Sequence, residues 1–106
     1  MIRHIVSFSL LAVLPLSALA DPAGDYAQNC AACHGADRLG GMGPALLPEN
    51  LERLRKTEAL KTIREGRAAT QMPAFKDQLS EADIAALADY AYAPVNPKPT
   101  WTEKDI

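Results

Sequence analysis

The sequence predicts an all-α protein with three to four short helices. Residues 21–106 contain 16 alanines and few runs of β-branched residues, and alanine favours helices whereas β-branched residues favour strands. Residues that typically cap helices flank two of the segments. The chain is also short enough for one small domain, which buries a limited fraction of its surface.

The first half of this domain is expected to contain a helix followed by loops. Residues 23–32 are predicted to be helical, and a glycine-rich loop follows at residues 39–44. Residues 46–54 are expected to form an irregular turn or a short helix. Residues 71–75 are predicted to form a second loop, in which Pro73 lacks a backbone N–H.

A second helix is expected over residues 58–65. Thr57 is predicted to cap its N-terminus, and Gly66 to end it. Its inward side is expected to consist of Ala59, Leu60 and Ile63.

The last helix is expected over residues 81–91. Ser80 is its predicted N-cap, and Asp83 stands three residues later in the position of a capping box. The segment that follows, residues 94–106, is predicted to be a non-helical tail, because proline cannot continue a helix. Its prolines are Pro94, Pro97 and Pro99.

Residues 1–20 have the features of a secretory signal peptide. Arg3 and His4 supply a positive start, residues 5–16 form an interrupted apolar run, and residues 18–20 form a small-x-small cleavage site. An uncleaved membrane anchor is the alternative, but the run is too short to span a bilayer comfortably. We therefore expect export to the periplasm and no membrane attachment after cleavage.

The predicted organisation is a cleaved signal peptide at residues 1–20, one domain at residues 21–93 and the tail at residues 94–106. Without the signal peptide the chain has 10 Lys and Arg against 13 Asp and Glu. This acidic balance gives no indication of nucleic-acid binding. A monomer is expected.

The residues with the clearest chemistry form a C-x-x-C-H sequence, in which Cys30 and Cys33 are followed by His34. This spacing is the signature of covalent c-type haem attachment. Each thiol can form a thioether to one vinyl group of a single porphyrin, and the imidazole can be the proximal iron ligand. The motif therefore predicts one covalent haem c and a redox function.

Two other interpretations use the same spacing. A disulfide or a thioredoxin-like dithiol would place it on a βαβ pattern, which the sequence does not show. A structural zinc site needs four ligands. Residues 21–106 contain two cysteines and one histidine, so zinc would have to recruit a carboxylate.

The second axial ligand is expected to be Met72. His4 leaves with the signal peptide, and Met42 lies only eight residues after His34, on the loop expected to cover the proximal side. The alternative is that Met72 merely fills the core. A thioether favours ferrous iron and occupies the sixth position, which argues against an enzyme.

The glycine-rich loop is expected to support His34 from the proximal side. Metal-bound histidines usually donate their other ring N–H to an acceptor, and the carbonyl of Pro44 is the candidate. Glycines at positions 40, 41 and 43 would let the backbone approach the porphyrin closely. An ordinary surface turn is the alternative.

The pattern over residues 25–93 resembles the class I cytochromes c. The matching features are Tyr26 four residues before Cys30, Leu87-x-x-Tyr90, Gly43-Pro44-x-Leu46 and Met72-Pro73-x-Phe75. The resemblance implies the class I cytochrome c fold, with the helices wrapped around one haem c.

A narrower resemblance concerns residues 30–49, which are similar to the small cytochrome c-55X (NirC) family of denitrification clusters and to the haem c domain of cytochrome cd1 nitrite reductase. The tail from Pro94 to Trp101 resembles the segment that follows that domain. The family implies a periplasmic one-electron carrier between a quinol-linked donor and cytochrome cd1 nitrite reductase. The alternatives are a redox accessory protein in haem d1 biogenesis, a small cytochrome subunit of another periplasmic oxidoreductase, and a ligand sensor or peroxidase-like enzyme with an open iron.

Positive charge is concentrated at residues 53–67 but is interleaved with glutamates. Such a segment could steer an acidic redox partner. A solvated helix face is the simpler interpretation. Trp101 is either a docking residue or part of a mobile tail.

Overall fold

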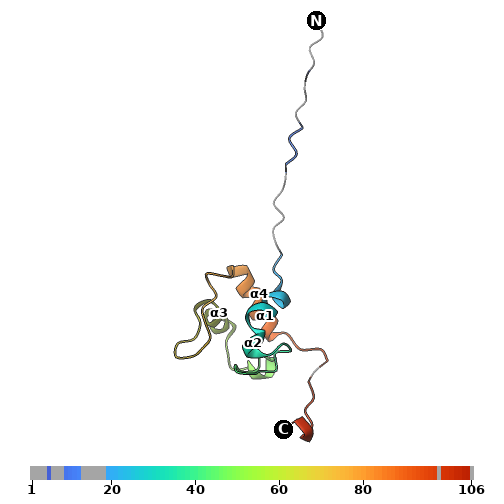
Figure 1. Ribbon diagram of the computed structural model, residues 1–106, viewed down its shortest axis with the longest axis vertical. Coiled ribbons are helices and arrows are strands. Elements are labelled where there is room, and N and C mark those ends of the chain that lie inside the picture. Colours follow the sequence, from blue (N-terminus) through green and yellow to red (C-terminus); the bar gives the residue numbers. More distant parts are fainter. Residues whose placement is uncertain (1–4, 6–8, 13–18, 98, 106) are drawn as a thin grey trace.

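The computed structural model describes residues 5, 9–12, 19–97 and 99–105. Within these ranges the regular structure is entirely helical (Figure 1). The elements are α1 (Pro22–Asn29), α2 (Ala31–His34), the 3₁₀ turn η1 (Pro48–Asn50), α3 (Lys56–Glu65), α4 (Glu81–Tyr92) and the 3₁₀ turn η2 (Glu103–Asp105). The all-α prediction is therefore confirmed.

Most of the predicted signal peptide, residues 1–20, lies outside the described residues. The leucines at positions 10 and 19, which are described, are each 93% exposed. In Figure 1 the described residues 9–12 lie away from the helices. In the described ranges there is no helix of sufficient length and apolarity to cross a membrane.

The centre of the fold is the packing of α1 against α4. The rings of Tyr26 and Tyr90 lie 5.2 Å apart, and Leu87 is almost fully buried. The Tyr26 hydroxyl donates to the Gly35 carbonyl at 2.7 Å, just beyond α2. Burial raises the pKa of Tyr26 to about 12, so this hydroxyl stays protonated as a donor.

The helix predicted over residues 23–32 is instead two helices. Cys30 has φ −122° and ψ −34°, outside helical values, so α1 ends at Asn29 and α2 begins at Ala31. This break redirects the chain so that the residue after α2 meets Tyr26. The prediction of one continuous helix was wrong because it used propensity alone.

The N-cap predicted for α3 was also wrong. The helix begins at Lys56 with Arg55 as N-cap, which places Thr57 inside the first turn. Lys56 forms an ion pair with Asp89 and lies 5.8 Å from the ring centre of Tyr92. The first residue of α3 thus contacts two residues of α4. The other end is as predicted, since Gly66 closes α3 with φ +72°.

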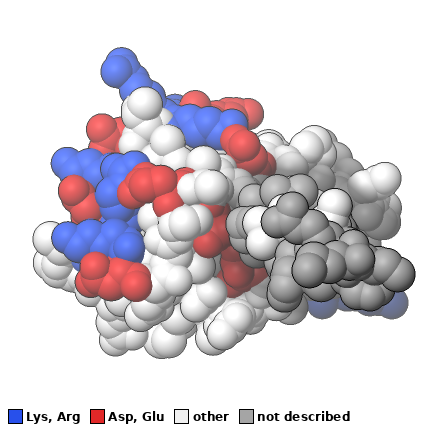
Figure 2. Space-filling model, turned by 90° about the horizontal axis from the view of Figure 1, so that it is seen from above, with Lys and Arg blue, Asp and Glu red and all other residues white. Residues whose placement is uncertain are grey.

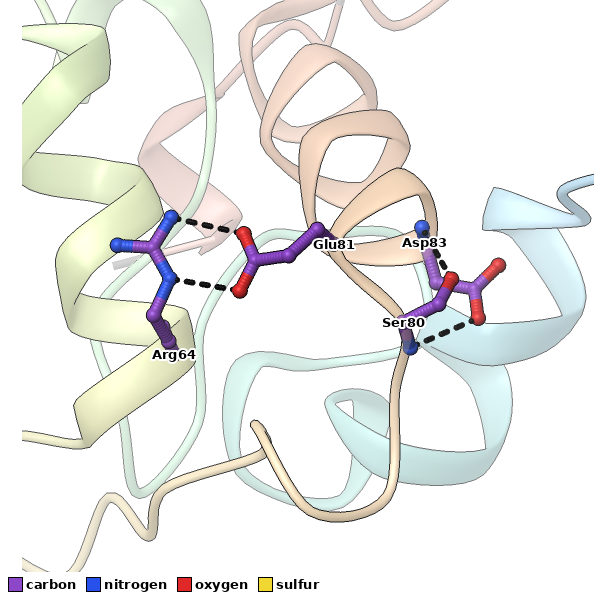
Figure 3. A network of polar contacts seen from close by, with 4 residues as sticks. All are labelled: Arg64, Ser80, Glu81 and Asp83. Atoms are coloured by element: carbon purple, nitrogen blue, oxygen red, sulfur yellow. Dashed lines mark hydrogen bonds and ion pairs between the residues drawn. The ribbon is translucent and has the colours of Figure 1, made fainter.

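The predicted capping box of α4 is confirmed (Figure 3). The Asp83 backbone N–H donates to Ser80 Oγ at 3.1 Å, and the Ser80 N–H donates to the Asp83 carboxylate at 3.2 Å. Beside it, the Arg64 guanidinium on α3 donates twice to the Glu81 carboxylate, both at 2.9 Å. The helix continues to Tyr92, one residue beyond the prediction. The two helices are thus joined at the start of α4.

The tail was predicted to be non-helical, but Glu103–Asp105 form a 3₁₀ turn. The 3₁₀ turn η2 follows the last of the prolines. No proline therefore has to donate a backbone hydrogen bond within this turn. Figure 1 shows this segment leading away from the helices. Trp101, before η2, is 63% exposed.

Candidate functional site

The predicted proximal ligand lies at the end of α2. His34 is half-buried, and its Nδ1 lies 2.7 Å from the Pro44 carbonyl oxygen. A carbonyl can only accept, so the proton of this bond is on Nδ1 and the lone pair of the neutral ring is on Nε2. An imidazole held in this tautomer is the form that binds a metal through Nε2.

The glycine-rich loop packs against this histidine. A Cβ at Gly43 would come within 3.0 Å of His34 Cε1 and 3.1 Å of its Nδ1. The Gly43 N–H donates to the Cys33 carbonyl at 2.7 Å, and the Gly40 N–H donates to the His34 carbonyl at 2.8 Å. The backbone of the glycine-rich loop therefore closely approaches the end of α2 and the imidazole of His34. Such a loop is a fixed support, unlike an ordinary surface turn.

The two thiols lie at the start of α2 and within it. Cys30 precedes the helix, Cys33 lies within it, and both are half-buried and free. Burial raises the pKa of Cys30 to about 11, and the charges of Asp25 and Cys33 add to the shift. Dithiols of thioredoxin type have lowered thiol pKa values instead. The environment of Cys30 thus disfavours a redox dithiol.

The two candidate methionines differ in their surroundings. Met42 is 76% exposed, whereas Met72 is half-buried. The Arg67 N–H donates to the Met72 carbonyl at 3.2 Å, and the Phe75 N–H donates to the Ile63 carbonyl at 3.1 Å. The segment around Met72 is therefore bonded to residues in and just after α3, which gives Met72 a defined place.

These residues fit a haem. Two thiols, an imidazole nitrogen and a thioether are the donors that covalent attachment and axial ligation require. Leu60 and Ile63, expected to face inward, are only half-buried, so apolar surface remains for a porphyrin to cover. In the described part of the chain, the buried hydrophobic residues are Tyr26, Leu47, Leu51, Ala59, Phe75, Ile84, Leu87 and Ala88.

Two hollows in the described surface are lined by residues other than His34 and Met72. They have volumes of about 240 and 250 Å³ and lie beside Arg38 and beside Lys61. Among the described residues, no three or more His, Cys, Asp or Glu side chains are grouped to hold a metal ion. The zinc interpretation therefore gains no support.

Arg38 is a structural residue that sequence reasoning missed. It is only 4% exposed, and its guanidinium donates to the carbonyls of Tyr90 and, at 2.5 Å, of Ala93. The guanidinium carbon also lies 5.0 Å from the centre of the Tyr90 ring. Arg38 therefore ties the loop after α2 to the C-terminus of α4. An arginine in a polar loop carries no sequence signal for this role.

The positive segment at residues 53–67 is not a patch of one sign. Figure 2 shows Lys and Arg mixed with Asp and Glu on the left, the side on which Figure 1 places α3. Lys56 and Arg64 are paired with Asp89 and Glu81. The Arg64 hydrogen bond also lowers the pKa of Glu81. This arrangement favours a solvated helix face over a steering patch.

A protein-family model matches most of this chain. Residues 17–90 match the model described as "Cytochrome C oxidase, cbb3-type, subunit III". The match includes the C-x-x-C-H sequence and Met72.

Individual proteins with sequences similar to this chain include cytochromes. The chain is 51% identical over 81 residues to dihydro-heme d1 dehydrogenase of Pseudomonas aeruginosa. The aligned region covers 76% of this chain but only 16% of that protein. The chain is 37% identical over 100 residues to cytochrome c55X of Stutzerimonas stutzeri, covering 82% of this chain and 88% of the relative. A solved structure of the c-type cytochrome NirC matches with a TM-score of 0.63 and 35% identity, covering 67% of this chain and 84% of the other.

Proposed function

Because this chain belongs to the c-type cytochrome family and binds haem c, we propose that it is a one-electron carrier with no substrate chemistry of its own. The haem supplies a reversible Fe(II)/Fe(III) couple. Cys30 and Cys33 attach it, His34 is the proximal ligand supported by the Pro44 carbonyl, and Met72 is the distal ligand.

The observation that carries this proposal is the hydrogen bond between His34 Nδ1 and Pro44. It leaves Nε2 available to iron and holds the ring in one orientation. The half-buried Met72, in contrast to the exposed Met42, supports a closed sixth position. A closed iron exchanges electrons but offers no site to a substrate.

We further propose that the carrier acts in the periplasm as a monomer. The features of residues 1–20 support export, and covalent haem attachment takes place outside the cytoplasmic membrane. The similarity to cytochrome c55X supports a quinol-linked donor and cytochrome cd1 nitrite reductase as acceptor.

Met72→Ala is expected to convert the protein into one with an open iron. The ferric sulfur-to-iron charge-transfer band should disappear and the reduction potential should fall, because the thioether favours ferrous iron. Optical spectra and a redox titration measure both. Met42→Leu is the control and should leave both unchanged. A charge-transfer band that survives in Met72→Ala would exclude Met72 as the ligand.

A second candidate function is electron supply to a step of haem d1 maturation. It is favoured by the 51% identity to dihydro-heme d1 dehydrogenase, although this chain spans only 16% of that protein. Deleting the gene distinguishes the two roles. If the nitrite reductase still acquires haem d1 while nitrite turnover in cells slows, the carrier role is supported. Accumulation of reductase without haem d1 would support the maturation role instead.

A further inference from the structure

We propose that the Thr70 hydroxyl is a positioning group for Met72, and that it sets how firmly this methionine holds the sixth position. The inference rests on the proposed ligation by Met72. Thr70 need not contact iron or porphyrin for this role, because it acts through the backbone of the ligand loop.

The hydroxyl closes a small ring of hydrogen bonds. Thr70 Oγ1 donates to the Arg67 carbonyl at 2.7 Å and accepts from the Met72 backbone N–H at 3.2 Å. The Arg67 N–H in turn donates to the Met72 carbonyl at 3.2 Å. A hydroxyl has one hydrogen to donate and lone pairs to accept, so one side chain satisfies both bonds. The Met72 backbone is thereby held on both its N–H and its carbonyl.

The backbone of the loop that carries Met72 has two residues with positive φ, Gly66 and Ala69, and packs closely against Gly66. Gly66 has φ +72°, and a Cβ there would come within 2.8 Å of the Met72 carbonyl oxygen and 2.9 Å of the Ala74 nitrogen. Ala69, beside Thr70, has φ +60°, a conformation that is unfavourable for a residue with a Cβ. The Thr70 bonds span this turn and help to hold it.

Thr70 is exposed, as are Arg67 and Ala69, so its hydroxyl can be removed without opening the core. The loss of one such hydrogen bond changes an equilibrium constant roughly fivefold. If the bond stabilises the closed loop selectively, its loss raises the fraction of molecules in which Met72 has left the iron. An external ligand for ferric iron then binds more tightly in the same proportion, roughly fivefold.

The experiment compares imidazole binding to the purified ferric holoprotein in Thr70→Val, Thr70→Ser and Thr62→Val. Thr62 is the matched control, because its hydroxyl also donates to a backbone carbonyl, that of Glu58, at 2.8 Å but does not bond to Met72. We expect Thr70→Val to bind imidazole roughly fivefold more tightly than the wild type. Thr70→Ser should restore wild-type affinity, and Thr62→Val should match the wild type.

The free energy of unfolding, measured in denaturant on the same samples, separates positioning from general stability. Equal imidazole affinities in Thr70→Val and Thr62→Val would overturn the inference, as would failure of Thr70→Ser to restore affinity. The proposed ligation fails independently if the wild type lacks the charge-transfer band that Met72→Ala should remove. A wild type with the band and an unresponsive Thr70→Val rejects only the role of Thr70.

Discussion

Replacing Cys30 and Cys33 together by alanine is expected to abolish coloured holoprotein and to leave a poorly folded chain. Among the described residues few hydrophobic side chains are buried, and Leu60 and Ile63 are only half-buried. Small domains with so limited a core depend on an additional tether. The covalently held porphyrin provides that tether in this fold.

A haem stain on a denaturing gel and far-ultraviolet circular dichroism measure the two consequences. The stain should be lost completely in the double variant, because no thioether can form, and the helical signal should fall. Ala32→Ser, an exposed change between the two cysteines, is the control and should stain as the wild type does. Stain that remains on the denatured double variant would mean that the haem is attached elsewhere.

Arg38→Ala is expected to lower the free energy of unfolding by about 3 kcal/mol. The substitution leaves the carbonyls of Tyr90 and Ala93 without the guanidinium that now bonds both. Each such carbonyl costs about 1–3 kcal/mol where it stays buried. The loss of a cation at the C-terminus of α4 adds to the effect.

Denaturant unfolding of the ferric holoprotein measures this change. Arg38→Lys should be intermediate, because a single ammonium cannot reproduce the planar fork that spans two carbonyls. Arg55→Ala is the control: Arg55 is exposed and its side chain makes no cap bond, so it should stay within about 0.5 kcal/mol of wild type. A loss in Arg38→Ala no larger than this would show that the loop after α2 is held by other contacts.

Local rules predicted the parts of the fold that depend on neighbours in the chain. Gly66 ends α3, and Ser80 and Asp83 form the capping box of α4, because both features involve residues at most four positions apart. They did not predict contacts between distant segments. Lys56 pairs with Asp89 on α4, and α3 begins at Lys56, before the predicted cap Thr57.

The candidate site divides in the same way. The C-x-x-C-H spacing by itself determined haem c chemistry, since attachment and proximal ligation need only adjacent residues. Tertiary structure alone decided that Met42 is exposed while the backbone of Met72 is held by hydrogen bonds. It also decided that Arg38 joins the loop after α2 to the end of α4. Burial and long-range hydrogen bonds arise from the packing of segments far apart in sequence, so no local pattern records them.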